Sequence, residues 1–315
     1  MTVYVVGLDG AEWSLLRRWM SEGALPELAD LVEEGVDGGL RSTLPPVTFP
    51  AWKCYSTGKT PGKLGVYEWF AFDREEPAIT SNDSTDFRSR EYWDVLADNG
   101  IEVGVVNMPT THPPNTGDGV HLVAGSPATE RGELTSPSDL KPALLDAVPG
   151  YRVKPDLVLD KASPDELVSE AMALADQRFD AATWLAGERG CDVVHTTVFV
   201  TDTVQHRLWD RPEKIRDLYE HIDERIGGLR ARDDCEAIVV MSDHGFVGID
   251  EVFLVNQWLL ERGDLVVGED TTRGALERVG LTQERLKRVV DRLGVVSAAP
   301  ALVPESAQRF FPSES

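Results

Sequence analysis

The sequence predicts an α/β fold in which helices cover both faces of a mostly parallel β-sheet. Two patterns carry this prediction. Short apolar runs alternate with longer amphipathic segments along residues 1–250, as in strand–helix–strand units. The runs are apolar at successive positions, which is typical of strands that are buried on both faces of a parallel sheet.

Four apolar runs are expected to form the strands. The first run ends at an acidic residue. Each later run follows an amphipathic helix or leads into polar residues, and these changes in pattern mark where each strand begins or ends. In chain order, the expected strands are Val3–Leu8, Glu102–Asn107, Val193–Val200 and Ala237–Met241.

The segments between these strands repeat apolar residues at helical spacing. Pro50 fits the first turn of a helix, with Thr48 or Phe49 expected at its N-cap. Residues 71–90 are polar and turn-rich. In chain order, the expected helices are Trp13–Glu22, Pro26–Glu34, the helix near Pro50, Tyr92–Asn99, Pro164–Glu188 and Arg211–Arg232.

Length and composition are those of a globular protein. The chain has 315 residues, of which 42% are hydrophobic and 27% charged. These values exclude a wholly disordered or fibrous protein and allow a large buried core. We expect a catalytic core over residues 1–250, with a loop-rich excursion over its active face at 109–160. Residues 251–315 are expected to form a helical tail, the start of an incomplete insertion or cap.

The charge balance argues against nucleic-acid binding. The 54 acidic and 31 basic residues give a formal net charge of −23. Such a field repels phosphates unless basic residues cluster, and here they are scattered. The acidic surface serves solubility or, as we favour, adaptation to high salt, where screening weakens the self-repulsion.

Neither disulfides nor a membrane partner are expected. Cys54, Cys191 and Cys235 are odd in number and form no CxxC pair. No apolar run approaches the ~20 residues that span a bilayer. The first residues lack a basic leader with a small-residue cleavage site. These features predict a cytoplasmic protein.

Metal-ligand residues follow three of the expected strands at their carboxyl ends, where open α/β sheets build their sites. Asp9 follows the first strand, Asp202 and His206 follow the third, and Asp243 and His244 follow the fourth. A helical turn would put Asp202 and His206, four residues apart, on one face. Each residue alone has a simpler role as a helix cap or a core histidine, but five together favour a metal site. Carboxylate and neutral imidazole ligands suit zinc, manganese or iron.

A hydroxyl group stands at the expected start of the helix near Pro50. Free backbone N–H groups and the helix dipole favour an anion at such a position. From the local sequence, an N-cap is the simpler role for Thr48. Its hydroxyl becomes a nucleophile only if a cation lowers its pKa or a base takes its proton.

Taken together, these motifs resemble the type I phosphodiesterase/nucleotide pyrophosphatase family of the alkaline phosphatase superfamily. The matching segments are GLDG at 7–10, PPVTFPAW at 45–52, TGKTPGKLGVYEW at 57–69, TDTVQHRLW at 201–209 and MSDHGF at 241–246. The resemblance implies an alkaline-phosphatase-like core and two divalent metal ions, usually zinc, with manganese as an alternative. It also implies that the matching threonine becomes transiently phosphorylated or nucleotidylated.

By position, the resemblance assigns a role to each of these residues. Asp9, Asp243 and His244 would hold the metal that binds and activates Thr48. The second metal would be held by the remaining pair, Asp202 and His206.

Two features of that family are missing. The second metal takes another histidine downstream, whereas this chain has none after His244, so the second site is incomplete. Truncation of a longer enzyme and a divergent short form both explain this. The family also places an asparagine about twenty residues after the nucleophile, and none stands there. His112 is a candidate substitute as a ligand or a substrate contact. For the phosphoryl oxygen, the candidates are the positive charge of Lys53, Lys59 or Lys63 and the backbone N–H groups near Phe49.

The leading hypothesis is therefore a metal-dependent hydrolase of small phosphodiesters or nucleotide pyrophosphates. A catalytically impaired or regulatory binding module is one alternative. A phosphonate hydrolase or a phosphoglycerate mutase-type phosphotransfer enzyme is another, although mutases of this superfamily generally use serine. The lack of a CxPxR-type motif at residues 48–50 argues against a sulfatase.

Overall fold

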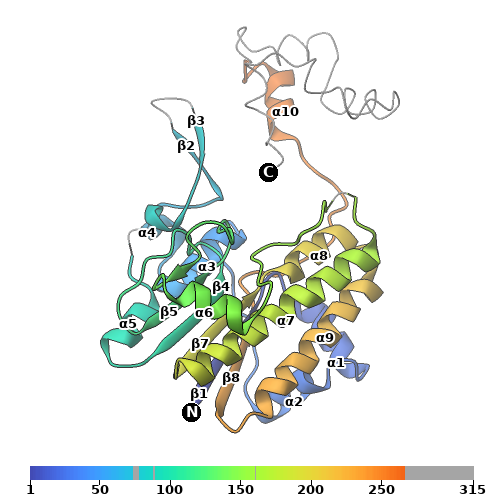
Figure 1. Cartoon of the computed structure of the whole chain (residues 1–315). Coiled ribbons are helices and arrows are strands. Elements are labelled where there is room, and N and C mark those ends of the chain that lie inside the picture. Colours follow the sequence, from blue (N-terminus) through green and yellow to red (C-terminus); the bar gives the residue numbers. More distant parts are fainter. Residues whose placement is uncertain (74–77, 88, 160, 267–315) are drawn as a thin grey trace. The chain divides into compact units, whose positions relative to one another are not determined.

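A computed structural model of the chain describes residues 1–73, 78–87, 89–159 and 161–266 (Figure 1). The chain divides into two compact units, Met1–Gly248 and Ile249–Ser315. The strands of the first unit's main sheet are β1 (Thr2–Leu8), β4 (Val103–Met108), β5 (Val120–Ala124), β6 (Thr135–Ser136), β7 (Val193–Val198) and β8 (Cys235–Met241).

These six strands form one sheet in the order β6-β5-β4-β7-β1-β8. Neighbouring strands are parallel except for β6, which runs antiparallel to β5. The register brings three strand ends level, because Leu8 of β1 lies opposite Val198 of β7, and Gly7 lies opposite Met241 of β8. The predicted α/β fold with a mostly parallel sheet is confirmed.

Helices connect the strands and cover both faces of the sheet. Alternate residues of β4 reach different hydrophobic clusters, as the pleat of a strand requires. Val103 and Val105 pack with Trp52 and Trp93, whereas Val106 joins the larger core. The helices of the first unit are α1 (Trp13–Ser21), α2 (Pro26–Glu34), α3 (Thr48–Thr57), α4 (Pro61–Leu64), α5 (Tyr92–Asp98), α6 (Leu140–Ala147), α7 (Pro164–Glu188), α8 (Val200–Leu208) and α9 (Pro212–Arg230).

The two faces carry different helices. Trp52 and Trp93 belong to α3 and α5, so these helices cover one face. The larger core holds buried residues of α1, α2, α7, α8 and α9, which cover the other face. Figure 1 shows α1, α2, α7 and α9 gathered on one side of the sheet. Burial on both faces explains the continuous apolar runs of the central strands.

The N-cap of helix α3 lies at least one residue earlier than predicted. Its N-cap is Val47, so the prediction of Thr48 or Phe49 at the cap is wrong. Pro50 takes the third helical position, still within the first turn, where its missing N–H leaves no intrahelical bond unmade. The N-cap residue Val47 has no polar side chain, so no side chain at this position caps α3.

The segment 109–160, predicted as a loop-rich excursion, also contains a strand of the main sheet. Strand β5 pairs with β4, and its residues are almost all buried. The segment holds β6 and α6 as well. The strand escaped prediction because its apolar run is only five residues long, includes His121 and lies among glycines and prolines.

The turn-rich segment 71–90 likewise contains more regular structure than its composition predicts. Strand β2 (Phe70–Asp73) pairs with β3 (Ala78–Ser81) as an antiparallel ribbon. Phe72 and Ile79 lie opposite each other and are both exposed. Backbone pairing rather than burial therefore forms this ribbon.

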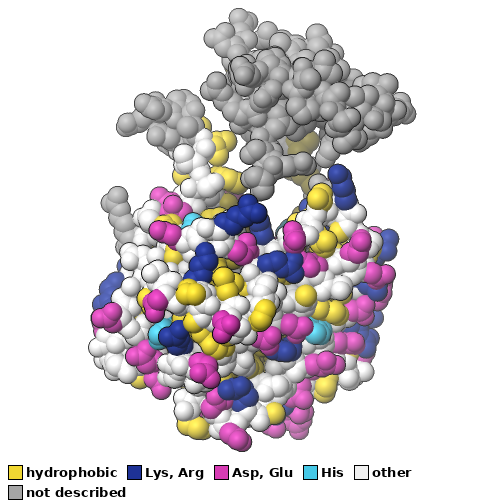
Figure 2. All heavy atoms as spheres, in the orientation of Figure 1, with side chains coloured by type: hydrophobic (Ala, Val, Ile, Leu, Met, Phe, Trp, Pro, Cys, Tyr) yellow, Lys and Arg dark blue, Asp and Glu magenta, His cyan; other side chains and the backbone are white. Residues whose placement is uncertain are grey.

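The surface mixes both signs of charge despite the acidic excess. On the face shown in Figure 2, acidic and basic side chains of the described residues are interspersed. Arg230 illustrates the pattern, because it pairs with Glu27, Asp30 and Glu34 at 2.7, 3.3 and 3.0 Å. A single arginine thus forms ion pairs with three acidic residues.

Of the second unit, the described part contains α10 (Val255–Arg262). The helical tail predicted over 251–315 falls for the most part, at 267–315, outside the described residues. Among the described residues, no helix combines the length and the apolar character that crossing a membrane requires.

Candidate functional site

The carboxyl ends of three adjacent strands form the centre of the site. Asp9 directly follows β1, Asp202 lies in the first turn of α8 after β7, and Asp243 and His244 follow β8. Because β1 lies between β7 and β8 and all three run parallel, these side chains meet at one edge of the sheet.

The Thr48 hydroxyl lies in contact with this cluster. Its Oγ1 is 2.9 Å from Nε2 of His244 and 3.4 Å from Oδ1 of Asp9. His244 Nε2 is in turn 3.5 Å from Asp9 Oδ1 and 3.4 Å from Asp243 Oδ2. Helix α3 therefore brings a hydroxyl into contact with an acid that follows β1 and an imidazole that follows β8.

The hydrogen bonds of His244 define its neutral tautomer. Nδ1 lies 2.9 Å from the carbonyl oxygen of Gly245, which can only accept, so Nδ1 carries the proton. Nε2 then has a free lone pair directed at Thr48 and the acids. A lone pair on the inward nitrogen, with the outward N–H held by a carbonyl, is the arrangement of a metal-binding histidine.

The acids and the imidazole fit a divalent cation. One ligand atom from each of Asp9, Asp202 and His244 lies within 4.8 Å of the others. Among the described residues, the buried oxygens Asp202 Oδ1 and Asp243 Oδ2 have no hydrogen-bond partner. Buried carboxylate oxygens without hydrogen bonds are costly, and a cation between them would compensate that cost.

Burial raises the pKa of each acid in the cluster. The pKa of Asp9 is held well above its usual range by burial and then by the charges of Asp243 and Asp202. Burial is also the main cause that raises the pKa of Asp202, and it raises the pKa of Asp243 to about 6. Buried acids with raised pKa values that lie next to one another are characteristic of a functional site.

His206 lies at the rim of the cluster. As expected from their spacing, His206 and Asp202 share one face of α8, with His206 Nε2 3.5 Å from Asp202 Oδ1. The His206 side chain is 65% exposed, and its ring packs edge-on against Phe246 at 4.8 Å. It therefore reaches the buried acid from the solvent side.

Three further residues from the sequence analysis lie away from the cluster. The Phe49 side chain is buried and packs on Trp69 at 4.7 Å, so only its backbone faces the helix start. Lys59 is exposed beyond the end of α3. His112 Nδ1 hydrogen-bonds the carbonyl oxygen of Glu133 at 3.1 Å. None of the three has a hydrogen bond to the cluster among the described contacts.

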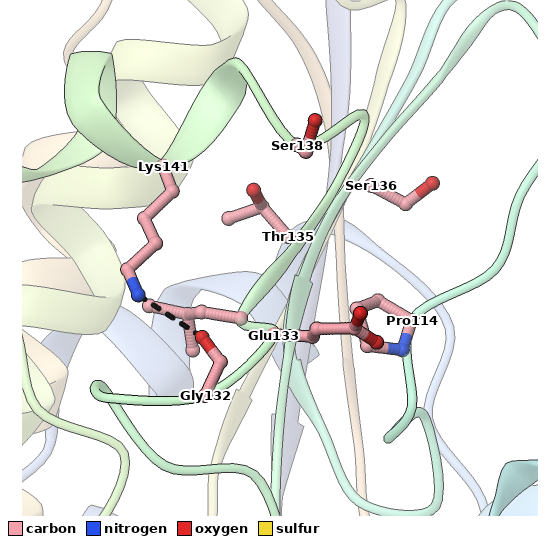
Figure 3. Close-up of a pocket in the computed structure, with 8 residues that line it drawn as sticks. Pro114, Gly132, Glu133, Thr135, Ser136, Ser138 and Lys141 are labelled. Atoms are coloured by element: carbon pink, nitrogen blue, oxygen red, sulfur yellow. Dashed lines mark hydrogen bonds between the residues drawn. The ribbon is translucent and has the colours of Figure 1, made fainter.

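A separate hollow of about 360 Å³ lies beside β6 (Figure 3). Lys141 borders it and donates to the carbonyl oxygen of Gly132 at 3.0 Å. Its lining residues are Pro114, Gly132, Glu133, Leu134, Thr135, Ser136, Ser138 and Lys141. None of them is a predicted metal ligand or nucleophile. The residues with those predicted roles lie at the carboxyl ends of β7, β1 and β8, several strands away from β6.

Two residues at the site escaped the sequence analysis. Trp52 donates its indole N–H to Asp9 Oδ2 at 2.7 Å. Ser242 Oγ accepts from the Ala11 N–H at 2.9 Å and donates to the His244 carbonyl at 2.7 Å, which ties the β8 loop to the β1 loop. The position of Trp52 four residues after Thr48 was the available signal, since that spacing places both on one helix face.

Comparison with known proteins identifies a family. The model of the type I phosphodiesterase / nucleotide pyrophosphatase family matches residues 3–306. No curated protein matches the sequence.

Solved structures resemble this chain at low sequence identity, and those with a TM-score above 0.5 share its fold. Phosphonoacetate hydrolase from Sinorhizobium meliloti 1021, in complex with phosphonoformate, has a TM-score of 0.57 and 20% identity. The match covers 83% of this chain but only 62% of that hydrolase. The same hydrolase with phosphonoacetate gives 0.56 at 20% identity, again over 83% and 62% of the two chains. Murine ectonucleotide pyrophosphatase / phosphodiesterase 5 gives 0.48 at 16% identity over 78% and 57%.

Proposed function

Because the chain belongs to the type I phosphodiesterase / nucleotide pyrophosphatase family, we propose that it is a metal-dependent hydrolase of phosphodiester or nucleotide pyrophosphate bonds. Thr48 is the nucleophile. One observation carries the proposal: the buried Thr48 hydroxyl contacts both His244 and Asp9, beside two carboxylate oxygens that have no hydrogen-bond partner among the described residues.

The ligands fall into two sets. Asp9, Asp243 and His244 would hold one cation next to Thr48, and Asp202 with His206 would hold a second. Zinc suits carboxylate and imidazole ligands, and manganese is the alternative. Bound cations supply positive charge that lowers the pKa of the threonine hydroxyl and balances charge on the leaving oxygen.

The reaction proceeds in two displacements at phosphorus. Thr48 Oγ1 loses its proton and forms a bond to phosphorus while the bond to the leaving oxygen breaks. Water then attacks the phosphorylated or nucleotidylated threonine and releases Thr48, which regains a proton. One diester and one water thus yield one monoester and one alcohol.

The start of α3 assists by binding phosphoryl oxygens. The backbone N–H groups of Thr48 and Phe49 have no intrahelical acceptors, because they belong to the first turn. They are directed toward the N-terminal end of the helix, where the dipole favours an anion. These groups take the place of the missing asparagine.

A kinetic comparison of threonine variants tests the proposal. Wild type, Thr48→Ala and Thr48→Ser are assayed on a bis-aryl phosphodiester, an aryl monoester and phosphonoacetate, with Zn²⁺ or Mn²⁺. We expect diester turnover by wild type, a loss of at least about 1,000-fold in kcat for Thr48→Ala and partial activity for Thr48→Ser.

Thr57→Ala is the matched control on the same helix. Its hydroxyl donates to the Lys53 carbonyl within α3, so its kcat should stay within about twofold of wild type. Diester turnover that survives in Thr48→Ala excludes Thr48 as nucleophile. Turnover of phosphonoacetate alone points to a phosphonate hydrolase, and metal binding without any turnover points to a binding module.

A further inference from the structure

Helix α3 contributes a second group to the site one turn after Thr48. The Trp52 indole N–H donates to Asp9 Oδ2 at 2.7 Å, and both side chains are completely buried. Thr48 and Trp52 are four residues apart and lie on one face of the helix. The nucleophile and the partner of Asp9 therefore belong to one rigid element.

The two oxygens of Asp9 have different partners. Oδ1 lies 3.4 Å from Thr48 Oγ1 and 3.5 Å from His244 Nε2, on the side of the proposed cation. Oδ2 is engaged by the indole N–H. A carboxylate with one oxygen held in this way offers a single oxygen to a metal.

The indole itself is held in place by its surroundings. Gly7 lies two residues before Asp9, on the same face of β1, and a Cβ there would overlap Trp52 Cη2. The rings of Tyr55 and His195 pack edge-on against the indole, each at 5.9 Å. The absence of a side chain at Gly7 thus provides the space that the ring fills.

We propose that Trp52 is a positioning residue that holds Asp9 as a monodentate ligand through Oδ1. It thereby sets the metal affinity of the site and its preference for small transition metals over Ca²⁺. This inference rests on the proposed metal-dependent function. Residues that hydrogen-bond a ligating group orient it and raise metal affinity, typically by about 10- to 100-fold. Ca²⁺ accepts bidentate carboxylates and a looser geometry, so it depends less on this restraint.

Two tryptophan variants of the same cluster separate positioning from packing. Trp93 is also completely buried and packs in the same hydrophobic cluster as Trp52. Within the described residues its indole N–H has no hydrogen-bond partner. Trp52→Phe and Trp93→Phe therefore remove the same atoms from the same cluster, and Trp52→Phe alone removes a hydrogen bond to Asp9.

The readout is the affinity of the full chain for Mn²⁺ and for Ca²⁺, each measured alone by competition with a chromophoric chelator. We expect Trp52→Phe to weaken Mn²⁺ binding by at least about tenfold and Ca²⁺ binding by less than about threefold. Trp93→Phe should change both by less than about twofold. A general loosening of the fold would instead weaken both metals in both variants.

Circular dichroism reports whether each variant folds. If Trp52→Phe does not fold, benzothienylalanine at position 52 replaces the N–H with sulfur at nearly constant shape and gives the same comparison. Equal Mn²⁺ affinity for the Trp52 and Trp93 variants overturns the inference while metal binding and Thr48-dependent turnover by wild type stand. A wild-type chain that binds neither Zn²⁺ nor Mn²⁺ overturns the proposed function and this inference with it.

Discussion

Asp9 illustrates at the residue scale how burial and chemistry are coupled. A fully buried carboxylate flanked by two others destabilises a fold unless hydrogen bonds or a cation compensate. The indole N–H of Trp52 donates to Asp9, which offsets part of that cost. The part of this free-energy cost that is not offset indicates that Asp9 is retained for its chemistry rather than for stability.

His195 illustrates the opposite case, a titratable residue retained for packing. It is completely buried in β7, and its ring nitrogens contact Thr197 Oγ1 at 2.9 Å and Tyr55 Oη at 3.4 Å. Burial lowers the pKa of His195 to about 3. The folded protein therefore holds this ring neutral at any pH near neutrality.

This depressed pKa predicts a loss of stability in mild acid. The unfolded chain binds a proton at His195 below about pH 6.5 and the folded chain only below about pH 3, so the free energy of unfolding falls between these limits. At pH 5 the loss from this residue is about 2 kcal/mol relative to pH 7. Urea unfolding at both pH values, on wild type and His195→Gln, measures it.

The informative quantity is the difference between the two pH values. His195→Gln is expected to be less stable at pH 7, because it disturbs a packed core, but to lose about 2 kcal/mol less than wild type on going to pH 5. If the variant loses as much unfolding free energy between pH 7 and pH 5 as wild type does, His195 takes up its proton in the folded protein as readily as in the unfolded chain.

At the scale of elements, an acid of one helix caps another. Asp223 of α9 accepts from the N–H groups of Glu27 at 3.0 Å and Leu28 at 2.8 Å, in the first turn of α2. Leu25, the N-cap residue of α2, makes no side-chain capping bond. The cap comes from a residue about 195 positions later in the chain and links the first helices to the last helix of the first unit.

Removal of this cap should destabilise the protein measurably. Asp223→Ala leaves two N–H groups without an acceptor and is expected to lower the free energy of unfolding by about 1–2 kcal/mol. The neighbouring Glu224→Ala changes an exposed acid of the same helix and should cost less than about 0.5 kcal/mol. Urea unfolding curves compare the two, and equal effects would show that the α2 cap contributes nothing.

At the scale of the whole molecule, the net charge of −23 is the dominant feature. Acidic residues greatly outnumber basic ones, so local ion pairs such as those of Arg230 neutralise only part of the charge. The remaining acids repel one another across the surface. Salt reduces this repulsion, because the screening length falls from about 10 Å at 0.1 M to about 3 Å at 1 M.

We therefore expect the protein to be stabilised by molar KCl. The melting temperature should rise by about 3–6 °C between 0.1 and 2 M KCl, equivalent to about 1–2 kcal/mol. Replacing the exposed acids Glu33, Glu213 and Glu236 by glutamine should reduce this rise, because less repulsion is left to screen. Differential scanning calorimetry measures both proteins, and a melting temperature that does not rise with salt contradicts a high-salt adaptation.

Local sequence patterns were sufficient for the regular elements with strong signals. The runs of β1 and β7 and the long helices α7 and α9 were predicted within two residues, because buried strands and amphipathic helices have distinct periodicities. Strand β5 and the β2–β3 ribbon were missed. Short strands depend on pairing with distant segments, and such pairing leaves little trace in their own residues.

The residue types at the strand ends can be read from the amino-acid sequence, which shows that acids, imidazoles and a hydroxyl are available for metal-assisted chemistry. The strand order β7-β1-β8, which brings those ends together, and the hydrogen bond from Trp52 to Asp9 become visible in the folded chain alone. The physical reason is that ligand geometry depends on contacts between segments up to about 230 residues apart, such as the Gly10 N–H to Asp243 Oδ1, whereas periodicity and capping report only on neighbours along the chain.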